Sequence, residues 1–136
     1  MIFAAGKGTR LKPLTDKIPK ALVQINEVTL LEHTITKLKL DGITDIIVNV
    51  HHFANQIIEF LQQKDFSGIN IHISDERNEL LDTGGGLKKA SWFFNDKEPI
   101  LLHNVDIISD IDINAMLVYH KETQAIATLA VRKRES

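Results

Sequence analysis

The chain has 136 residues, of which 43% are hydrophobic and 25% are charged, and its formal net charge is −2. This balance is that of a globular domain that can bury about 65–70% of its unfolded surface; it excludes a disordered or fibrous protein, and the absence of cysteine excludes disulfides and thiolate metal sites. A net charge this close to zero does not indicate a nucleic-acid-binding protein. No apolar run approaches the ~20 residues of a membrane span, and the N-terminus lacks a signal-peptide pattern, so we expect a cytoplasmic protein. The sequence leaves its oligomeric state open.

The chain opens with the apolar run Ile2–Ala5, which stops at Gly6 and predicts a short buried strand. The segment Gly6–Lys20 has no helical period and contains two prolines, so we expect a long, stiff loop. A short extended piece is predicted over Ala21–Ile25, and Thr29 is a candidate N-cap for the first helix.

Two amphipathic helices and two strands are predicted next. The first helix ends at Gly42, and the buried strand Asp45–Val50 follows it. A second helix is then followed by a strand in which isoleucines alternate with polar residues over 69–73. The apolar residues at helical spacing are Leu31, Ile35 and Leu38 in the first helix, and Phe53, Ile57, Phe60 and Leu61 in the second.

The second half repeats this alternation. Thr83–Gly86 comes at or before the start of a helix that carries Leu87, Ala90 and Phe94 at helical spacing. A buried strand is predicted to begin at Ile100–Leu102 and to end near Asp106. Asp110 or Asp112 is expected to cap the last helix, with Ile113, Met116 or Leu117, and His120 on one face, and Ala125–Val131 is predicted to form a final strand. This order predicts an α/β domain, a Rossmann-like three-layer sandwich with a mostly parallel central sheet.

Three loops follow the carboxyl ends of predicted strands, where ligands bind in such sheets: Gly6–Lys20, Glu76–Gly86 and the turn at Asp106. Glycines let backbone N–H groups approach an anion, and nearby cations neutralise its charge. Two familiar glycine motifs do not fit the first loop. The dinucleotide fingerprint needs glycine where Leu11 stands and a helix directly afterwards, and the P-loop needs serine or threonine where Gly8 stands.

The run AAGKGTRLKPLTDKIPKALV resembles the signature of the sugar-1-phosphate nucleotidyltransferases. The runs LDTGGGLKKA and NVDIISDIDINAML resemble the second and third motifs of this family, in the same order and at similar spacing. Members that make mannose or N-acetylmuramate nucleotide sugars are the most similar, on LDTGGG and ATLAVRKR. The resemblance implies a magnesium-dependent reaction in which a sugar 1-phosphate attacks the α-phosphorus of a nucleoside triphosphate, giving a nucleotide sugar and pyrophosphate.

The resemblance also implies roles for individual residues. Arg10 is expected to bind the triphosphate, Lys20 to bridge the α-phosphoryl group and the sugar phosphate, and Asp106 to bind Mg²⁺. The segment Glu76–Gly85 is expected to lie over the base and ribose. The expected nucleotide-binding residues are Ala5, Gly6, Gly8, Thr9, Glu76, Thr83 and Gly85.

Two departures from the family pattern limit these expectations. Val105 stands where the family usually has glycine or serine before the metal aspartate. The family's catalytic domain is also longer, and its later part supplies a second metal aspartate and most sugar contacts. Residues 1–136 are therefore expected to be the N-terminal nucleotide-binding portion, without the C-terminal sugar-binding portion, and a nucleotide-binding sensor or regulatory subunit without catalysis is the alternative.

Simpler structural explanations exist for several motifs. Asp106 also fits a solvated strand end or a helix cap, and Thr83–Gly86 fits a flexible helix entry. His51 and His52 are adjacent on an extended segment and point to opposite sides, so packing is expected rather than a shared metal ion. Trp92–Phe94 is expected to pack in a helix, and the basic run at 132–134 to be a solvated end.

Overall fold

The computed structural model describes residues 1–95 and 97–132, and a four-stranded parallel sheet forms its centre. The strands are β1 (Ile2–Phe3), β4 (Asp45–Val50), β5 (Asn70–Asp75) and β6 (His103–Asn104), in the order β5-β4-β1-β6. Every neighbouring pair in this sheet is parallel. The carboxyl ends of the strands therefore lie along one edge of the sheet, as the predicted α/β class requires.

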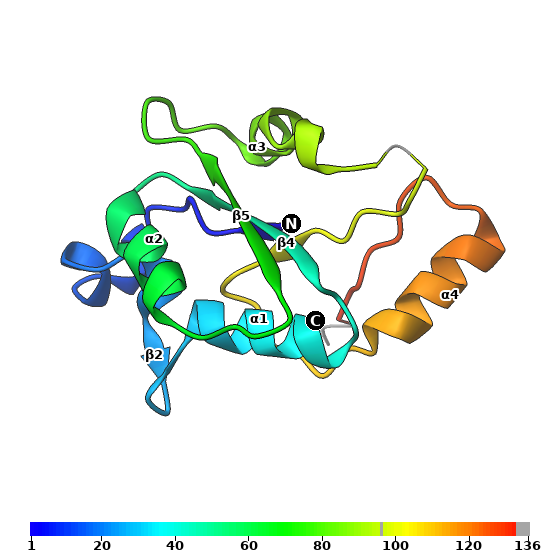
Figure 1. Cartoon of the computed structure of the whole chain (residues 1–136), viewed down its shortest axis with the longest axis horizontal. Coiled ribbons are helices and arrows are strands. Elements are labelled where there is room, and N and C mark those ends of the chain that lie inside the picture. Colours follow the sequence, from blue (N-terminus) through cyan, green and yellow to red (C-terminus); the bar gives the residue numbers. More distant parts are fainter. Residues whose placement is uncertain (96, 133–136) are drawn as a thin grey trace.

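Helices cover both faces of the sheet (Figure 1). The helices α1 (Leu30–Leu40) and α2 (Ala54–Gln63) lie against one face, and α3 (Thr83–Lys89) lies against the other together with a short 3-10 turn over Ser91–Phe93. The predicted three-layer arrangement is confirmed. The fourth helix, α4 (Ile113–Thr123), lies beyond the sheet at one end of the molecule and has no buried residue.

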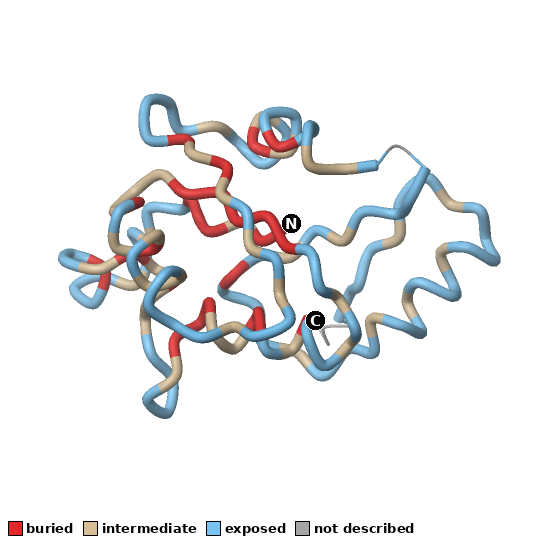
Figure 2. Tube along the Cα trace, viewed as in Figure 1, coloured by how far each residue is buried: buried red, intermediate tan, exposed pale blue. Residues whose placement is uncertain are grey.

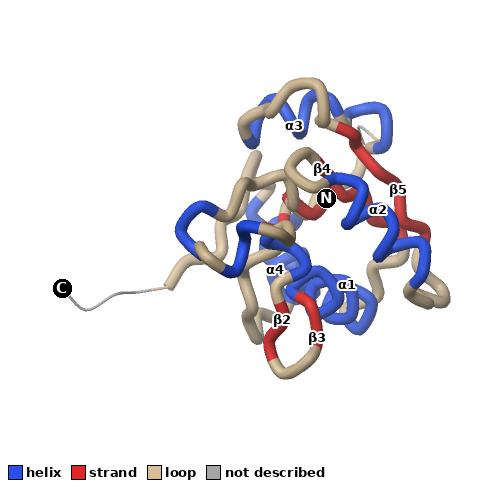
Figure 3. Tube along the Cα trace, turned by 90° about the vertical axis from the view of Figure 1, so that its left-hand side faces the viewer, coloured by secondary structure: helices blue, strands red, loops and turns tan. Residues whose placement is uncertain are grey.

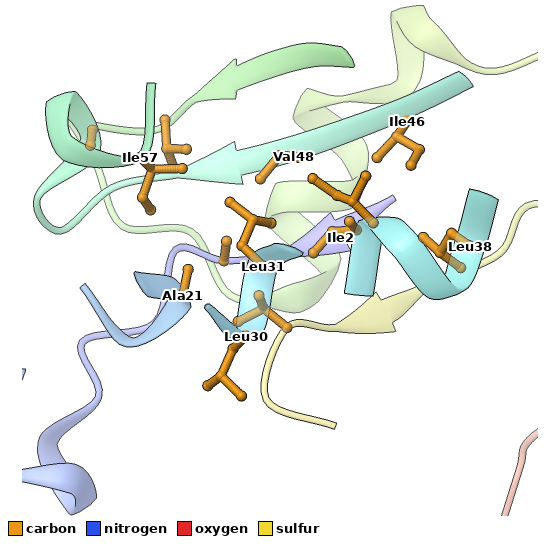
Figure 4. Close-up of a cluster of buried hydrophobic side chains, with 13 residues drawn as sticks. Ile2, Ala21, Leu30, Leu31, Leu38, Ile46, Val48 and Ile57 are labelled. Carbon is orange, nitrogen blue, oxygen red and sulfur yellow. The ribbon is translucent and has the colours of Figure 1, made fainter. Parts of the chain in front are cut away.

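The alternation of side chains along β4 divides the core between the two faces. Ile46, Val48 and Val50 belong to the larger cluster, in which they pack with residues of α1 and α2 (Figure 4). Ile47 points the other way, into a smaller cluster with Met1 and Ala90. Complete burial of each such aliphatic side chain contributes about 1.5–3 kcal/mol, so these central strands carry much of the stability. Figure 2 shows the buried residues gathered along them.

Local signals at both ends of α1 are confirmed. Thr29 caps the helix, because its Oγ1 accepts a hydrogen bond of 3.1 Å from the backbone N–H of Glu32. Gly42 follows the last turn with φ +86°, a conformation that glycine adopts at little cost. Before the helix, a small antiparallel hairpin pairs β2 (Gln24–Ile25) with β3 (Val28–Thr29). The extended piece predicted over Ala21–Ile25 is thus only partly extended, since Lys20–Leu22 forms a 3-10 turn.

The expectations for the end of the chain are only partly correct. The strand predicted from Ile100 is limited to His103–Asn104, and Ile100 and Leu102 are 44% and 42% exposed rather than buried. Asp112 caps α4 as predicted, accepting a 2.9 Å hydrogen bond from the N–H of Ala115.

No strand forms over Ala125–Val131 in the described residues, which corrects the prediction of a final strand. The residues Ile126, Leu129 and Val131 are 104%, 81% and 86% exposed. A strand is stabilised by hydrogen bonds to a neighbour, and the apolar alternation of this segment finds no strand to pair with in the described part of the chain. Of the basic run at its end, 133–134 lies outside the described residues.

The aromatic triplet after α3 divides in two. Phe93 and Phe94 pack against the smaller core cluster, whereas Trp92 is 63% exposed and meets Phe93 edge-to-face. Packing against this cluster explains Phe93 and Phe94 but not Trp92.

Among the described residues, no helix combines the length and the apolar character that crossing a bilayer requires.

Candidate active site

The opening loop leaves the sheet at the end of β1 and lies on one side of the molecule (Figures 1 and 3). Its main chain is held where it departs, because the N–H groups of Ala4 and Ala5 donate to Oδ1 of Asn49 at 2.7 and 3.3 Å. Beyond this point the loop has no α-helix and forms short 3-10 turns at Thr9–Leu11 and Leu14–Asp16, as its prolines and lack of period predict.

Gly8 is the point at which the loop folds back on itself. Its φ of +65° lies in the left-handed region, and a Cβ atom there would come within 2.9 Å of Cγ2 of Thr15 and 3.1 Å of Cβ of Lys20. The buried Thr15 donates from its hydroxyl to the carbonyl of Gly8 at 2.8 Å, which closes the loop. Gly6, by contrast, has nothing within 4 Å of its Cβ position, so the loop presents open space at that glycine.

Lys20 and Asp106 meet although they lie far apart in the sequence. The Lys20 ammonium donates a hydrogen bond to Oδ2 of Asp106, which lies two residues beyond the end of β6. The Lys20 side chain is 19% exposed and that of Asp106 is 38% exposed, so both remain accessible to a ligand. The fully buried Pro19 and Ala21 on either side of Lys20 fix its backbone. The structure thus brings two of the three predicted catalytic or metal-binding residues together.

Arg10 is exposed in the turn Thr9–Leu11 and makes no ion pair or side-chain hydrogen bond within the described residues. It is one of several charges concentrated in this loop. Residues 7–20 contain five cations and one carboxylate, namely Lys7, Arg10, Lys12, Lys17 and Lys20 against Asp16. Of these cations, only Lys12 approaches Asp16, with its Nζ 3.5 Å from Oδ1. Both side chains are well exposed, so this pair neutralises little of the positive charge of the loop. The loop is positive in a chain that is negative as a whole.

Glu76 begins the segment that was expected to lie over the base and ribose. It follows β5 but is completely buried, and its Oε1 accepts a 2.9 Å hydrogen bond from Nδ2 of Asn49. Its Oε2 has no hydrogen-bond partner among the described residues. The side chain therefore lies beneath the surface that was expected to face the base and ribose.

The glycines of α3 differ in their surroundings. Thr83 and Gly84 are exposed, and Gly84 has nothing within 4 Å of its Cβ position. A Cβ at Gly85 would meet the Leu81 side chain at 3.1 Å, and one at Gly86 would meet Oε1 of Glu76 at 2.9 Å. The last glycine thus leaves room for the buried carboxylate, and the exposed start of the helix is the part open to a ligand.

An ion pair holds the beginning of the loop after β5. Arg77 donates to Oδ2 of Asp75 at 2.7 Å and to Oδ1 of Asn55, in α2, at 2.8 Å. The hydrogen bond from Arg77 is the main reason that the pKa of the Asp75 carboxyl lies below its usual range. This pair is exposed, so it directs the loop more than it stabilises the fold.

Asn49 was missed by the sequence analysis. Its only sequence signal is one amide side chain inside the otherwise apolar run of β4. It is 3% exposed and contacts both the opening loop and Glu76. Of the two adjacent histidines, His51 is hydrogen-bonded through Nδ1 to the carbonyl of Glu76. No cluster of three potential metal-binding side chains occurs in the described part of the chain.

The comparison with protein families matches residues 1–136 to the model described as "Nucleotidyl transferase". Among curated proteins, an N-acetylmuramate alpha-1-phosphate uridylyltransferase of Caulobacter vibrioides is 39% identical over 79% of this chain and 45% of its own length. A mannose-1-phosphate guanyltransferase of Gibberella zeae is 36% identical over 99% of this chain and 37% of its own length. The chain thus spans less than half the length of these two relatives.

Solved structures match the same architecture. HddC from Yersinia pseudotuberculosis, in complex with GMP-PN, superposes with a TM-score of 0.78 at 28% identity, over 88% of this chain and 52% of that one. An apo UDP-glucose pyrophosphorylase superposes with a TM-score of 0.70 at 17% identity, over 90% of this chain and 54% of that one, which shows a shared fold. The α/β fold with its central parallel sheet is therefore common to these proteins.

Proposed function

Since the chain belongs to the nucleotidyl transferase family, we propose that it binds a nucleoside triphosphate between the opening loop and the exposed start of α3. In the complete polypeptide this site transfers a nucleoside monophosphate to a sugar 1-phosphate, giving a nucleotide sugar and pyrophosphate. The observation that carries the proposal is the meeting of Lys20 with Asp106 beside a cationic, glycine-containing loop. The names of the two curated relatives, both transferases acting on a sugar 1-phosphate, support the same reaction.

The chemistry requires positioning and charge neutralisation more than proton transfer. A phosphate monoester has its second pKa near ~6, so the attacking oxygen is already ionised at neutral pH and needs no protein base. This oxygen forms a bond to the α-phosphorus, and the bond from that phosphorus to the oxygen of the β-phosphate breaks, releasing pyrophosphate. Negative charge accumulates on the α-phosphoryl oxygens, where nearby cations lower the barrier.

Two cations suit this task by their placement. Lys20 lies at the carboxyl edge of the sheet on a backbone fixed by buried neighbours, so its ammonium is held in position for the α-phosphoryl group and the incoming sugar phosphate. Arg10 is exposed and lacks a protein partner among the described residues, and its guanidinium fork matches the oxygens of the β- and γ-phosphates.

The Asp106 carboxylate fits a magnesium ion in its donor chemistry. It is accessible, it follows β6 at the ligand-binding edge of the sheet, and only one of its oxygens receives the Lys20 hydrogen bond. Magnesium is usually held by one or two carboxylates, phosphate oxygens and water, so Asp106 would supply one of the protein ligands. Bound there, the ion would neutralise charge on the phosphate oxygens.

The segment from Thr83 to Gly85 is proposed to face the base and ribose, because the start of α3 is exposed and Gly84 has open space beside it. The two curated relatives differ in their nucleotide, uridylyl in one and guanyl in the other. GTP and UTP are therefore the first candidates for the nucleotide.

A calorimetric titration of the chain with ATP, CTP, GTP and UTP, with and without Mg²⁺, tests the proposal. Saturable binding of at least one of the four, strengthened by Mg²⁺, is the expected result. Absence of binding by all four would contradict it.

Release of pyrophosphate on adding mannose 1-phosphate or N-acetylmuramate 1-phosphate to the complete polypeptide distinguishes a transferase from a nucleotide-binding sensor. The nucleotide-binding sensor is the second candidate. Binding without any release of pyrophosphate would favour it.

A further inference from the structure

Asn49 occupies an unusual place for an amide side chain. In β4 it is flanked by Val48 and Val50, both completely buried, and it is itself only 3% exposed. Burying an amide costs free energy unless its donors and acceptor are hydrogen-bonded, so this position demands partners. The structure supplies them on two different loops.

The first partner is the start of the opening loop. β1 pairs with β4 through Phe3, which lies opposite Asn49, and then diverges from the ladder. The next two N–H groups, those of Ala4 and Ala5, donate to Oδ1 of Asn49 at 2.7 and 3.3 Å. The side chain of Asn49 thus replaces the backbone acceptor that these groups would lack, and it sets where the chain leaves the sheet.

The second partner is Glu76. Its Oε1 accepts from Nδ2 of Asn49 at 2.9 Å, so the amide nitrogen faces the carboxylate and the amide oxygen faces Ala4 and Ala5. The Glu76 main chain is fixed in turn, since its N–H donates to the carbonyl of Val50 at 2.7 Å. Gly86 leaves the space that the carboxylate occupies.

We propose that Asn49 is a positioning residue for the nucleoside triphosphate site, and that Glu76 sets the direction of its amide. The pair joins the carboxyl ends of β1, β4 and β5 to the third glycine of α3, so the opening loop and the start of α3 keep a fixed relation before nucleotide arrives. This inference rests on the proposed function, because the loop that Asn49 holds is the proposed triphosphate site. Neither residue is placed in contact with the reacting atoms.

Reversing the polarity of the pair tests the proposal. Asn49→Asp keeps an acceptor for Ala4 and Ala5 but sets a carboxylate against Glu76, so we expect the affinity for the preferred one of GTP and UTP to fall by about tenfold or more. Glu76→Gln retains an acceptor for Nδ2 of Asn49 and should change the affinity by less than about threefold. In the double variant, the introduced glutamine amide donates to the introduced aspartate, and the affinity should return to within about threefold of the unaltered chain.

Hydrogen exchange and a matched control separate positioning from stability. The amides of Ala4 and Ala5 should exchange faster in Asn49→Asp and slow again in the double variant. Ile35→Val in α1 removes one methyl group from a completely buried residue and alters no hydrogen bond of either loop, so it should lower stability but leave the nucleotide affinity unchanged. A merely structural role predicts that affinity follows stability in every variant, including Ile35→Val.

Several results would overturn the inference. Nucleotide affinity that is unchanged in Asn49→Asp would do so while leaving the proposed function intact. The inference would also be overturned if the double variant failed to fold, or if it folded and bound nucleotide no better than Asn49→Asp. If Asn49→Asp alone is too unstable to measure, the folding and the nucleotide affinity of the double variant decide whether the inference holds. Absence of binding by the unaltered chain would contradict the proposed function and the inference together.

Discussion

Lys20 donates a hydrogen bond to Asp106 across 86 positions of sequence, joining the end of the opening loop to the end of β6. Both side chains are partly exposed, so the pair contributes only about 0–1 kcal/mol to folding. Its value lies in placing a cation beside a carboxylate at the edge of the sheet where phosphates are proposed to bind.

The two residues should respond oppositely to substitution when Mg²⁺ is absent. Lys20→Ala should weaken nucleoside triphosphate binding by about tenfold or more, because a charge-assisted contact is lost. Asp106→Asn should instead strengthen binding by about threefold or more, because it removes a negative charge beside the phosphates, and it should abolish the gain that Mg²⁺ gives. Calorimetric titration with EDTA and with Mg²⁺ measures both effects. Equal weakening by the two substitutions would contradict the arrangement.

The first two glycines of the opening loop should separate stability from binding. Gly8→Ala requires a left-handed backbone and brings Cβ within 2.9 Å of Thr15, so we expect it to lower the free energy of unfolding by about 1–2 kcal/mol or more. Gly6→Ala meets nothing within 4 Å and should leave stability nearly unchanged. It should nevertheless weaken nucleotide binding, because the methyl group enters the space proposed for the ligand. Urea denaturation and calorimetry together test this contrast, and a Gly6→Ala variant with full affinity would contradict it.

Gly84 and Gly86 offer a similar comparison in α3. An alanine at Gly86 would press on Oε1 of Glu76 and on Nδ2 of Asn49, at 2.9 and 3.1 Å, which predicts a loss of about 1–3 kcal/mol. Gly84→Ala has open space and should be neutral or slightly stabilising, since alanine favours helix. Thermal unfolding of the two variants measures the difference. Equal melting temperatures would show that Gly86 is not constrained by the buried pair.

His103 makes stability depend on pH. Burial lowers the pKa of its imidazole below the usual 6.5, so the folded state resists a proton that the unfolded state accepts. The contribution is complete above the unfolded pKa and is lost progressively as the pH falls below about 6.5 towards the lower folded pKa. His103→Gln should therefore flatten this part of the stability profile in denaturation measured between pH 8 and pH 5. An unchanged slope would exclude His103 as its source.

Much of the fold could be predicted because local signals and tertiary packing agree. Asp45–Val50 is apolar throughout most of its length and forms β4 with the predicted bounds, and Thr29 and Asp112 cap helices as their side chains suggest. The segment Ala125–Val131 has an equally good strand pattern but remains irregular, because a strand also depends on a neighbour that the sequence pattern does not reveal.

The candidate site, too, could be predicted only in part. The resemblance identified Lys20 and Asp106 from motifs, and the structure brings them together. It gave no reason to expect Glu76 beneath the surface or Asn49 beside it, because their pairing depends on how β4, β5 and α3 pack. A lone amide within an apolar strand is a weak signal until its partners are seen.

The most direct test of the central claim compares Arg10→Ala with Lys39→Ala by calorimetric titration with GTP and UTP in the presence of Mg²⁺. Lys39 is a cation in the last turn of α1, on the chain segment that leads into the amino end of β4 and so away from the proposed site. Both variants lose one positive charge, so a general charge effect is matched. A fall in affinity of about tenfold or more for Arg10→Ala, with little change for Lys39→Ala, is the predicted result. Equal affinities in the two variants would contradict the assignment of the opening loop as the triphosphate site.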